Sequence, residues 1–238
     1  MPTLAMIVKD LREQWELLRG WLDELPDPAS SEPSTLPGWS IADLVAHLGR
    51  VMDSISALRP AGPDDDGDPL SLSAYLATYA TADAEYFDRL ARELTASIAN
   101  APLDHLDRMA ERAFADIEAL TAAPDADQAV VVARRGPIEL PDFLMSRLIE
   151  LVVHGYDLAP TLPLPTPVDP TARRLVAQAL IEVARQRTGE AIDVGDEAAW
   201  IATATGRLDW PSAVGRGAVR PSSLSDGTPD LTASLPLL

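Results

Sequence analysis

The chain of 238 residues contains no cysteine. It therefore has neither the residues for a disulfide framework nor a thiol nucleophile of its own. If the protein performs sulfur chemistry, the sulfur has to arrive with a bound small molecule.

Long apolar runs are also absent, because nowhere do the roughly 18 successive apolar residues of a membrane helix follow one another. The first residues reach a charge at Lys9 and lack the apolar core of a signal peptide. From the sequence we expect a cytoplasmic protein that does not interact with membranes.

Positive charge is scarce, since 19 Lys and Arg residues face 37 Asp and Glu residues, for a net charge of -18. Such an acidic chain repels phosphate backbones and acidic membrane surfaces, so nucleic acid is excluded as an expected partner. The length is sufficient for one main domain with its own core and a smaller second one.

What the sequence does have is helical periodicity. Apolar residues from Leu4 to Leu25 alternate in steps of four and three, which predicts a first helix. Ser40 followed by Asp43 predicts the capped start of a second helix, to about residue 55. Similar patterns predict helices over 71–99 and 102–120.

Two stretches break this pattern. Residues 128–140 combine β-branched residues with Arg-Gly-Pro, which predicts a short hairpin, whereas residues 59–69 have the composition of an acidic loop. The proline-rich stretch after Pro160 indicates a boundary between a helical domain (1–162) and a small C-terminal domain (163–238). In the latter we expect helices at 171–188 and 197–205 and a strand at 191–194.

The stretch 142–158 is apolar almost all the way round a helix, with one narrow polar line. That line comprises Arg147, Glu150, His154 and Asp157. A surface helix shows the reverse, a broad polar face and an apolar stripe. We therefore predict a buried helix whose polar line points inside the protein.

Buried charges need partners or a metal ion. Glu150 and His154 are four residues apart and so share one side of the helix, within reach of a single cation. His47, at the edge of the core stripe of the second helix, is the candidate third ligand. Two histidines and a carboxylate form the ligand set of catalytic zinc sites and also of non-haem iron sites. Asp157 and Arg147 would then orient these ligands.

Each of these residues also has a purely structural interpretation. Arg147, Glu150 and Asp157 could form an interior salt-bridged network around a neutral His154. The pair Arg134-Arg135 before Gly136 suits an anionic ligand at the mouth of the site, but also a solvated turn. The two arginines of the C-terminal part, Arg207 and Arg220, leave the same two interpretations open.

Two segments resemble the mycothiol-dependent maleylpyruvate isomerase family. Residues 36–48 contain P-G-W-x-x-x-D-L-x-x-H, and residues 150–158 contain E-x-x-x-H-x-x-D-L. The C-terminal segments 204–208 and 235–238 are also similar to that family. The stretch between the two expected C-terminal helices is shorter than in many members, which leaves the substrate open.

The resemblance implies a mainly α fold, a DinB-like antiparallel four-helix bundle with a small C-terminal α(+β) domain. It implies a divalent metal, usually zinc, held by His47, Glu150 and His154. The metal would activate the thiol of mycothiol, a small thiol of actinobacteria, for cis-trans isomerisation of a maleylpyruvate-like acid or for thiol transfer to a small electrophile.

We assign roles to four further arginines. Arg207 and Arg220 are candidate catalytic residues, and Arg134 and Arg135 are candidate cofactor-binding residues. We expect a monomer or homodimer acting on a small unsaturated acid or electrophile. The alternatives are a non-catalytic metal-binding or dimerisation module and a hydrolase that uses metal-activated water.

Overall fold

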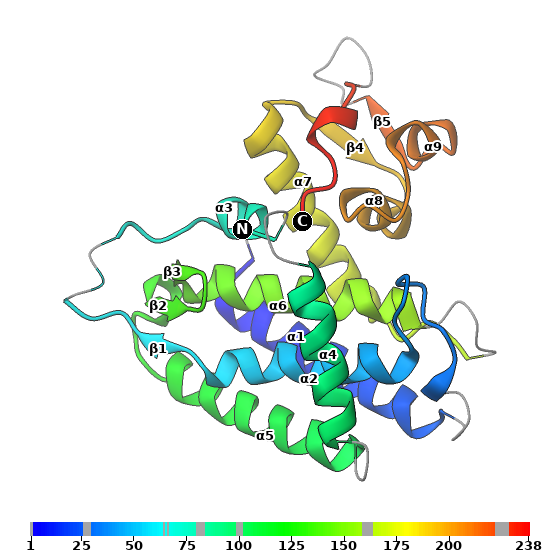
Figure 1. Cartoon of the computed structure of the whole chain (residues 1–238). Coiled ribbons are helices and arrows are strands. Elements are labelled where there is room, and N and C mark those ends of the chain that lie inside the picture. Colours follow the sequence, from blue (N-terminus) through cyan, green and yellow to red (C-terminus); the bar gives the residue numbers. More distant parts are fainter. Residues whose placement is uncertain are drawn as a thin grey trace.

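The structure, a computed structural model, describes residues 2–25, 30–63, 65, 67–79, 84–98, 102–158, 164–221 and 229–238. Four helices lie side by side and form the bundle: α1 (Leu4–Asp23), α2 (Ile41–Ser56), α5 (Pro102–Thr121) and α6 (Leu140–Leu158). α1 and α6 run in one direction and α2 and α5 in the other, while α4 (Ala84–Ile98) crosses the bundle (Figure 1). The mainly helical fold predicted from the sequence is confirmed.

The start of α2 is fixed by the predicted cap. The Ser40 hydroxyl accepts a hydrogen bond from the Asp43 N–H (3.2 Å), and the Asp43 carboxylate accepts one from the Ser40 N–H (3.0 Å). This reciprocal pair satisfies two backbone N–H groups that the first turn of a helix leaves open. It anchors α2 one turn before His47.

The prediction of a single helix over 71–99 is wrong, because the described residues form α3 (Leu72–Ala77) and, after a change of direction, α4. The Thr78 and Tyr79 N–H groups bond to carbonyls only three residues back, at Tyr75 and Leu76, and the Thr78 hydroxyl donates to the Tyr75 carbonyl (2.6 Å). These short-range bonds tighten and end the helix. The apolar spacing carries no sign of them.

The predicted hairpin is confirmed as β2 (Val130–Ala133) and β3 (Gly136–Glu139), which pair antiparallel. A third strand, β1 (Arg59–Pro60), joins the edge of β2, so the first residues of the predicted acidic loop belong to the sheet. Backbone pairing can recruit two residues without any alternation of side chains, which is why composition alone gave no strand here. β3 leads directly into α6.

The C-terminal part begins with α7 (Pro170–Thr188), capped by Asp169 and ended by Gly189 at φ +76°. It continues with β4 (Ile192–Val194), α8 (Glu197–Ala204), α9 (Trp210–Gly215) and β5 (Val219–Pro221), and β4 pairs with β5. Short 3-10 turns span Ala126–Gln128 and Thr232–Ser234. The helices and the strand expected here are confirmed.

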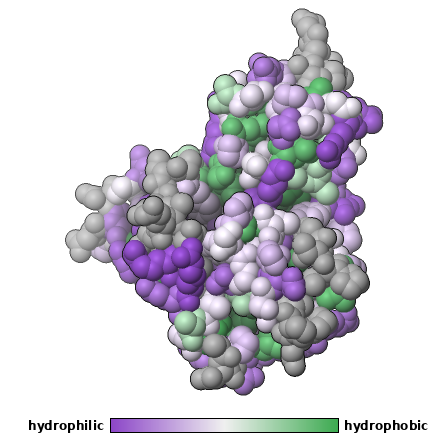
Figure 2. Space-filling model, turned by 45° about the vertical axis from the view of Figure 1, so that its right-hand side comes forward, coloured by the Kyte–Doolittle hydropathy of each residue, from purple (hydrophilic) through white to green (hydrophobic). Residues whose placement is uncertain are grey.

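α7 packs on α1 and α6, so the bundle and the C-terminal part are in contact. Figure 2 shows the two as an upper and a lower lobe, with hydrophobic residues visible among hydrophilic ones on the upper lobe. The predicted boundary near residue 162 lies outside the described residues and stays a prediction. No helix in the described part of the chain has the length and apolarity needed to cross a membrane.

α6 is the buried helix that the sequence predicts. Its side chains at Leu144, Leu148 and Leu151 have no exposed surface, and even Arg147 and Asp157 are 7% and 3% exposed. Burial of this kind supplies the core with roughly 1.5–3 kcal/mol per large apolar side chain. The polar line of α6 therefore lies within the protein, where every charge needs a partner.

Candidate metal centre

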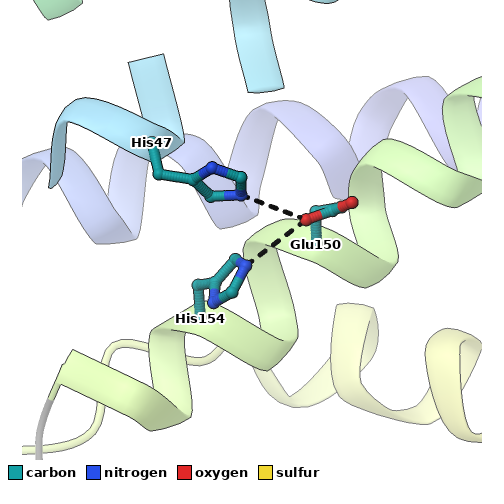
Figure 3. A group of neighbouring side chains, drawn as sticks. All are labelled: His47, Glu150 and His154. Carbon is teal, nitrogen blue, oxygen red and sulfur yellow. Dashed lines mark hydrogen bonds and ion pairs between the residues drawn. The ribbon is translucent and has the colours of Figure 1, made fainter. Parts of the chain in front are cut away.

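Three side chains from two helices converge at one point (Figure 3). His47 comes from α2, and Glu150 and His154 come from successive turns of α6. The Glu150 Oε2 atom lies 3.4 Å from His47 Nε2 and 3.3 Å from His154 Nε2. One possible ligand atom from each residue lies within 4.8 Å of the other two. The structure thus brings together the three residues that the sequence suggested as ligands.

The P-G-W segment before α2 supports the first of these histidines. Gly38 adopts φ +81°, a conformation that residues with a Cβ rarely adopt, and this turn carries Trp39 against the His47 ring at 5.5 Å between centroids. The His47 ring also meets the His154 ring edge-on at 4.8 Å. Packing therefore restricts both rings.

Asp157 sets the tautomer of His154. Its Oδ2 atom lies 3.0 Å from His154 Nδ1. Burial would raise the pKa of Asp157, but hydrogen bonds from Arg207 and His154 outweigh it and hold that pKa well below its ordinary value. The carboxylate therefore accepts, and His154 Nδ1–H donates. In the neutral ring this leaves the lone pair of Nε2 facing Glu150.

Glu150 is also ionised. Burial opposes the charge, yet hydrogen bonds from His154 and His47 and the nearby Arg147 hold the pKa of Glu150 well below its ordinary value. Burial lowers the pKa of His47, which favours the neutral imidazole. Two imidazole nitrogens thus face one carboxylate oxygen, and all three are electron-pair donors.

Such a cluster needs a positive charge at its centre. A divalent metal satisfies all three groups at once, and the donor set of two nitrogens and one oxygen fits zinc. The competing occupant is a proton: burial opposes it, but the Asp157 and Glu150 carboxylates outweigh burial and raise the pKa of His154. The alternative predicted from the sequence, a salt-bridged network around a neutral His154, differs from this second occupant, because the raised pKa favours a protonated His154.

Arg147 is held chiefly by hydroxyl groups. It donates to Ser54 Oγ (3.2 Å), Ser146 Oγ (3.2 Å) and, through a very short contact, to the Tyr79 hydroxyl. Its Nη2 atom lies 3.9 Å from Glu150 Oε1. Arg147 therefore supports the Glu150 carboxylate through a longer ion pair, consistent with the orienting role expected from the sequence.

Arg207 reaches the site from the C-terminal part. Its guanidinium donates to both carboxylate oxygens of Asp157, at 2.8 Å and 2.5 Å, and to the Thr205 carbonyl at 2.9 Å. Thr35, from the loop before α2, adds a hydroxyl bond to Asp157 Oδ1 at 3.0 Å. These contacts make Arg207 a residue that positions Asp157.

The other three predicted arginines lie on β5 and in the turn between β2 and β3. Arg220 is exposed on β5, in register with Asp193 of β4. Arg135 donates to the carbonyl and hydroxyl of Thr78 (3.0 and 3.1 Å), and its guanidinium stacks on the Tyr79 ring. Arg134 lines a cavity on the α2 side of the site.

Three cavities lie in the described structure close to α6. One of about 550 Å³ lies between α6, α8 and residues 35–37 and includes Asp157 and Arg207. One of about 320 Å³ includes Arg50 and Ser54 of α2, and one of about 630 Å³ lies between α1, α3, α6 and α7. None of the three candidate ligands lines any of these cavities. The ligand side chains keep some exposure of their own, from 12% to 21%.

Sequence reasoning missed several residues of the site. Thr35, Ser54 and Tyr79 each hold one of the groups that support the candidate ligands. Each comes from a different segment and is a common polar residue, so periodicity cannot single it out. Among the supporting residues, only Trp39 could be recognised from the sequence, because it belongs to the P-G-W motif.

Comparisons with known proteins identify the family and the fold. The model of the mycothiol maleylpyruvate isomerase N-terminal domain matches residues 11–159. Two solved structures have the same fold: crystal structures of the mycothiol-dependent maleylpyruvate isomerase and of a mutant of it, each 17% identical and covering 97% of both chains, with TM-scores of 0.52 and 0.54. No curated protein matches the chain. Since the domain model spans more than half of the chain, the protein belongs to the mycothiol maleylpyruvate isomerase family.

Proposed function

We propose that the chain is a metal-dependent enzyme that uses mycothiol, either to isomerise a maleylpyruvate-like acid from cis to trans or to transfer the thiol to a small electrophile. The observation that carries the proposal is the convergence of His47, Glu150 and His154 on one point. Membership of a family named for a mycothiol-dependent isomerase supports the cofactor. The absence of cysteine fits an imported thiol.

The residues present suit a zinc ion, because ionised Glu150 and two imidazole nitrogens are typical ligands and leave a coordination position open. When bound, such a metal lowers the pKa of a thiol or water and so makes a nucleophile at neutral pH. The protein needs no cysteine for this purpose.

The surrounding residues hold this donor set in place. The Asp157 carboxylate accepts a hydrogen bond from His154 Nδ1–H and thereby keeps the Nε2 lone pair directed at Glu150. Arg207 and Thr35 fix the Asp157 carboxylate in turn. The cavity of about 550 Å³ beside Asp157 and Arg207 has the size of a small-molecule site.

The test is turnover of maleylpyruvate by the purified, zinc-loaded protein with and without mycothiol. We expect the trans product only when both zinc and mycothiol are present, and none from His47→Ala. Consumption of mycothiol by an added electrophile, without isomerisation, would assign the protein to thiol transfer. Turnover that continues without mycothiol would contradict the thiol mechanism and favour metal-activated water.

One observation favours a non-catalytic module as the second candidate. None of His47, Glu150 and His154 lines any of the three cavities described above, whereas an enzyme needs access to the metal itself. Full metal content without mycothiol binding or turnover would support the module.

A further inference from the structure

The cavity of about 320 Å³ beside α2 contains two guanidinium groups, those of Arg50 and Arg134. The chain as a whole carries a net charge of -18, so a cavity with two positive groups in its wall stands out. Asp53 also lines it, but this side chain is 52% exposed and lies 3.9 Å from Arg112 Nη1. The acidic group in the wall is therefore paired with an arginine that does not line the cavity.

Two polar groups in this wall are available for a ligand. Within the described residues, the Arg50 guanidinium forms no hydrogen bond or ion pair with the protein. The same holds for the hydroxyl of Tyr75, although this side chain is 3% exposed and its ring packs against Phe143. A half-buried guanidinium and a phenol hydroxyl in the wall of one cavity offer hydrogen-bond donors of the kind that recognise carboxylates.

The cavity lies along the helix pair that carries the candidate metal ligands. α2 and α6 run in opposite directions, so moving forward from His47 and backward from Glu150 leads to the same place (Figure 1). Arg50 is three residues after His47, and Phe143 is seven residues before Glu150. Ser54, which also lines the cavity, accepts the Arg147 hydrogen bond and so connects the cavity with the site.

These positions set the length of a ligand that would extend from the cavity toward the candidate metal ligands. Three residues correspond to about 4.5 Å along a helix axis and seven residues to about 10 Å. A small organic acid of a few carbon atoms spans this range between a group near His47 and a carboxylate at Arg50. The aromatic rings of Tyr75 and Phe143 suit the carbon skeleton of such an acid better than a bare inorganic ion.

We propose that this cavity is a carboxylate subsite, in which Arg50 and the Tyr75 hydroxyl bind one carboxylate of a small organic acid whose other end points toward the centre formed by His47, Glu150 and His154. Arg134 adds a second positive group to the wall. The inference rests on the proposed function, because it assigns the subsite to the substrate of that enzyme. It makes Arg50 a residue that determines specificity.

The test measures binding of maleate to the zinc-loaded protein and to the metal-free protein, both without mycothiol, by NMR titration. Arg50→Met is expected to bind maleate about tenfold more weakly than the unaltered protein in both states, because it removes a charge-assisted bond. Arg50→Lys keeps the positive charge but lacks the planar guanidinium group, so its affinity for maleate is expected to lie between those of Arg50→Met and the unaltered protein. Arg216→Met, which removes an exposed arginine of the C-terminal part, is the matched control and is expected to bind as the unaltered protein does.

Two further probes test the chemistry of the ligand. Maleamide, the uncharged diamide, is expected to bind weakly and equally to all variants. Inorganic phosphate is expected to bind more weakly than maleate, and tighter phosphate binding would overturn the assignment to a carboxylate. Equal maleate affinity of Arg50→Met and the unaltered protein, with circular dichroism showing both folded, would overturn the subsite.

This outcome is distinguishable from failure of the proposed function. Maleate binding through Arg50 without any mycothiol-dependent turnover would contradict the proposed enzyme activity and support the subsite. Mycothiol-dependent turnover with an unchanged KM in Arg50→Met would support the proposed enzyme activity and contradict the subsite.

Discussion

Arg207 and Asp157 form a two-pronged ion pair, with Nε–Oδ1 at 2.8 Å and Nη2–Oδ2 at 2.5 Å. The guanidinium comes from the C-terminal part and the carboxylate from α6 of the bundle. Since Asp157 also bonds to His154 Nδ1, the C-terminal part acts on a candidate metal ligand through one intermediate side chain. Arg207 therefore contributes to the centre from the C-terminal part without being one of its three candidate ligands.

Replacing this arginine is expected to weaken metal binding. In Arg207→Met, Asp157 loses two charge-assisted bonds and holds the His154 ring less firmly, so zinc affinity should fall by about 10–100-fold. Competition with a chromophoric chelator measures this affinity directly. Arg174→Met, an exposed arginine on α7, is the matched control, and an equal loss of affinity in both variants would contradict the relay.

The capping carboxylate of α2 gives a pH-dependent prediction. Asp43→Ala removes the acceptor for the Ser40 N–H and for the Thr95 hydroxyl, and we expect it to lower the free energy of unfolding by about 1 kcal/mol at pH 7. Asp104→Ala is the matched control, because Asp104 is an exposed acidic residue at the third position of α5. Urea denaturation of both variants measures the difference.

The sign of the pH effect follows from the pKa of Asp43. Burial would raise it, but the bonds from Ser40 and Thr95 outweigh burial and lower it. A carboxyl group whose pKa is lower in the folded state than in the unfolded state stabilises the fold fully when the pH is above its unfolded-state pKa, about 4. This stabilisation is lost as the pH falls through the folded-state pKa. The gap between Asp43→Ala and the unaltered protein should therefore shrink below about pH 4. A gap that widens on acidification would refute this assignment.

Two helical glycines should respond in opposite ways to alanine. A Cβ at Gly155 would lie 2.8 Å from the Pro167 carbonyl oxygen and 2.9 Å from Val168 Cγ2, so backbone has to shift, and we expect a loss of about 1–3 kcal/mol. At the exposed Gly20 of α1 a Cβ meets nothing within 4 Å. There alanine should stabilise by up to about 1 kcal/mol through helix propensity. Thermal and urea denaturation of both variants check the pair, and a stabilised Gly155→Ala would contradict the packing described for α6.

Much of the fold and the centre of the site could be predicted from the sequence, because they depend on local patterns. Helical spacing identifies α1, α2 and α5, and the one polar line on an apolar helix indicates that Glu150 and His154 face inward. The cap formed by Ser40 and Asp43 fixes where α2 begins. These features need no knowledge of distant residues.

The remainder depends on contacts between distant segments. The partner of Arg207 is 50 residues away, and Tyr79 reaches Arg147 from 68 residues away. The break between α3 and α4 follows from bonds at Thr78 that leave no trace in the apolar spacing. For the same reason Arg50 was not predicted as a site residue, since its position beside a cavity appears only when α2 is assembled with α3, α4, α5 and α6.

The metal content of the purified protein, compared with that of His154→Ala, tests the central claim most directly. The account predicts close to one zinc or other divalent ion per unaltered chain and almost none in the variant, with both chains folded by circular dichroism. Equal metal content in the two proteins, or none in either after incubation with zinc, would contradict a centre built from His47, Glu150 and His154. In that case the three side chains would form the proton-bridged network instead.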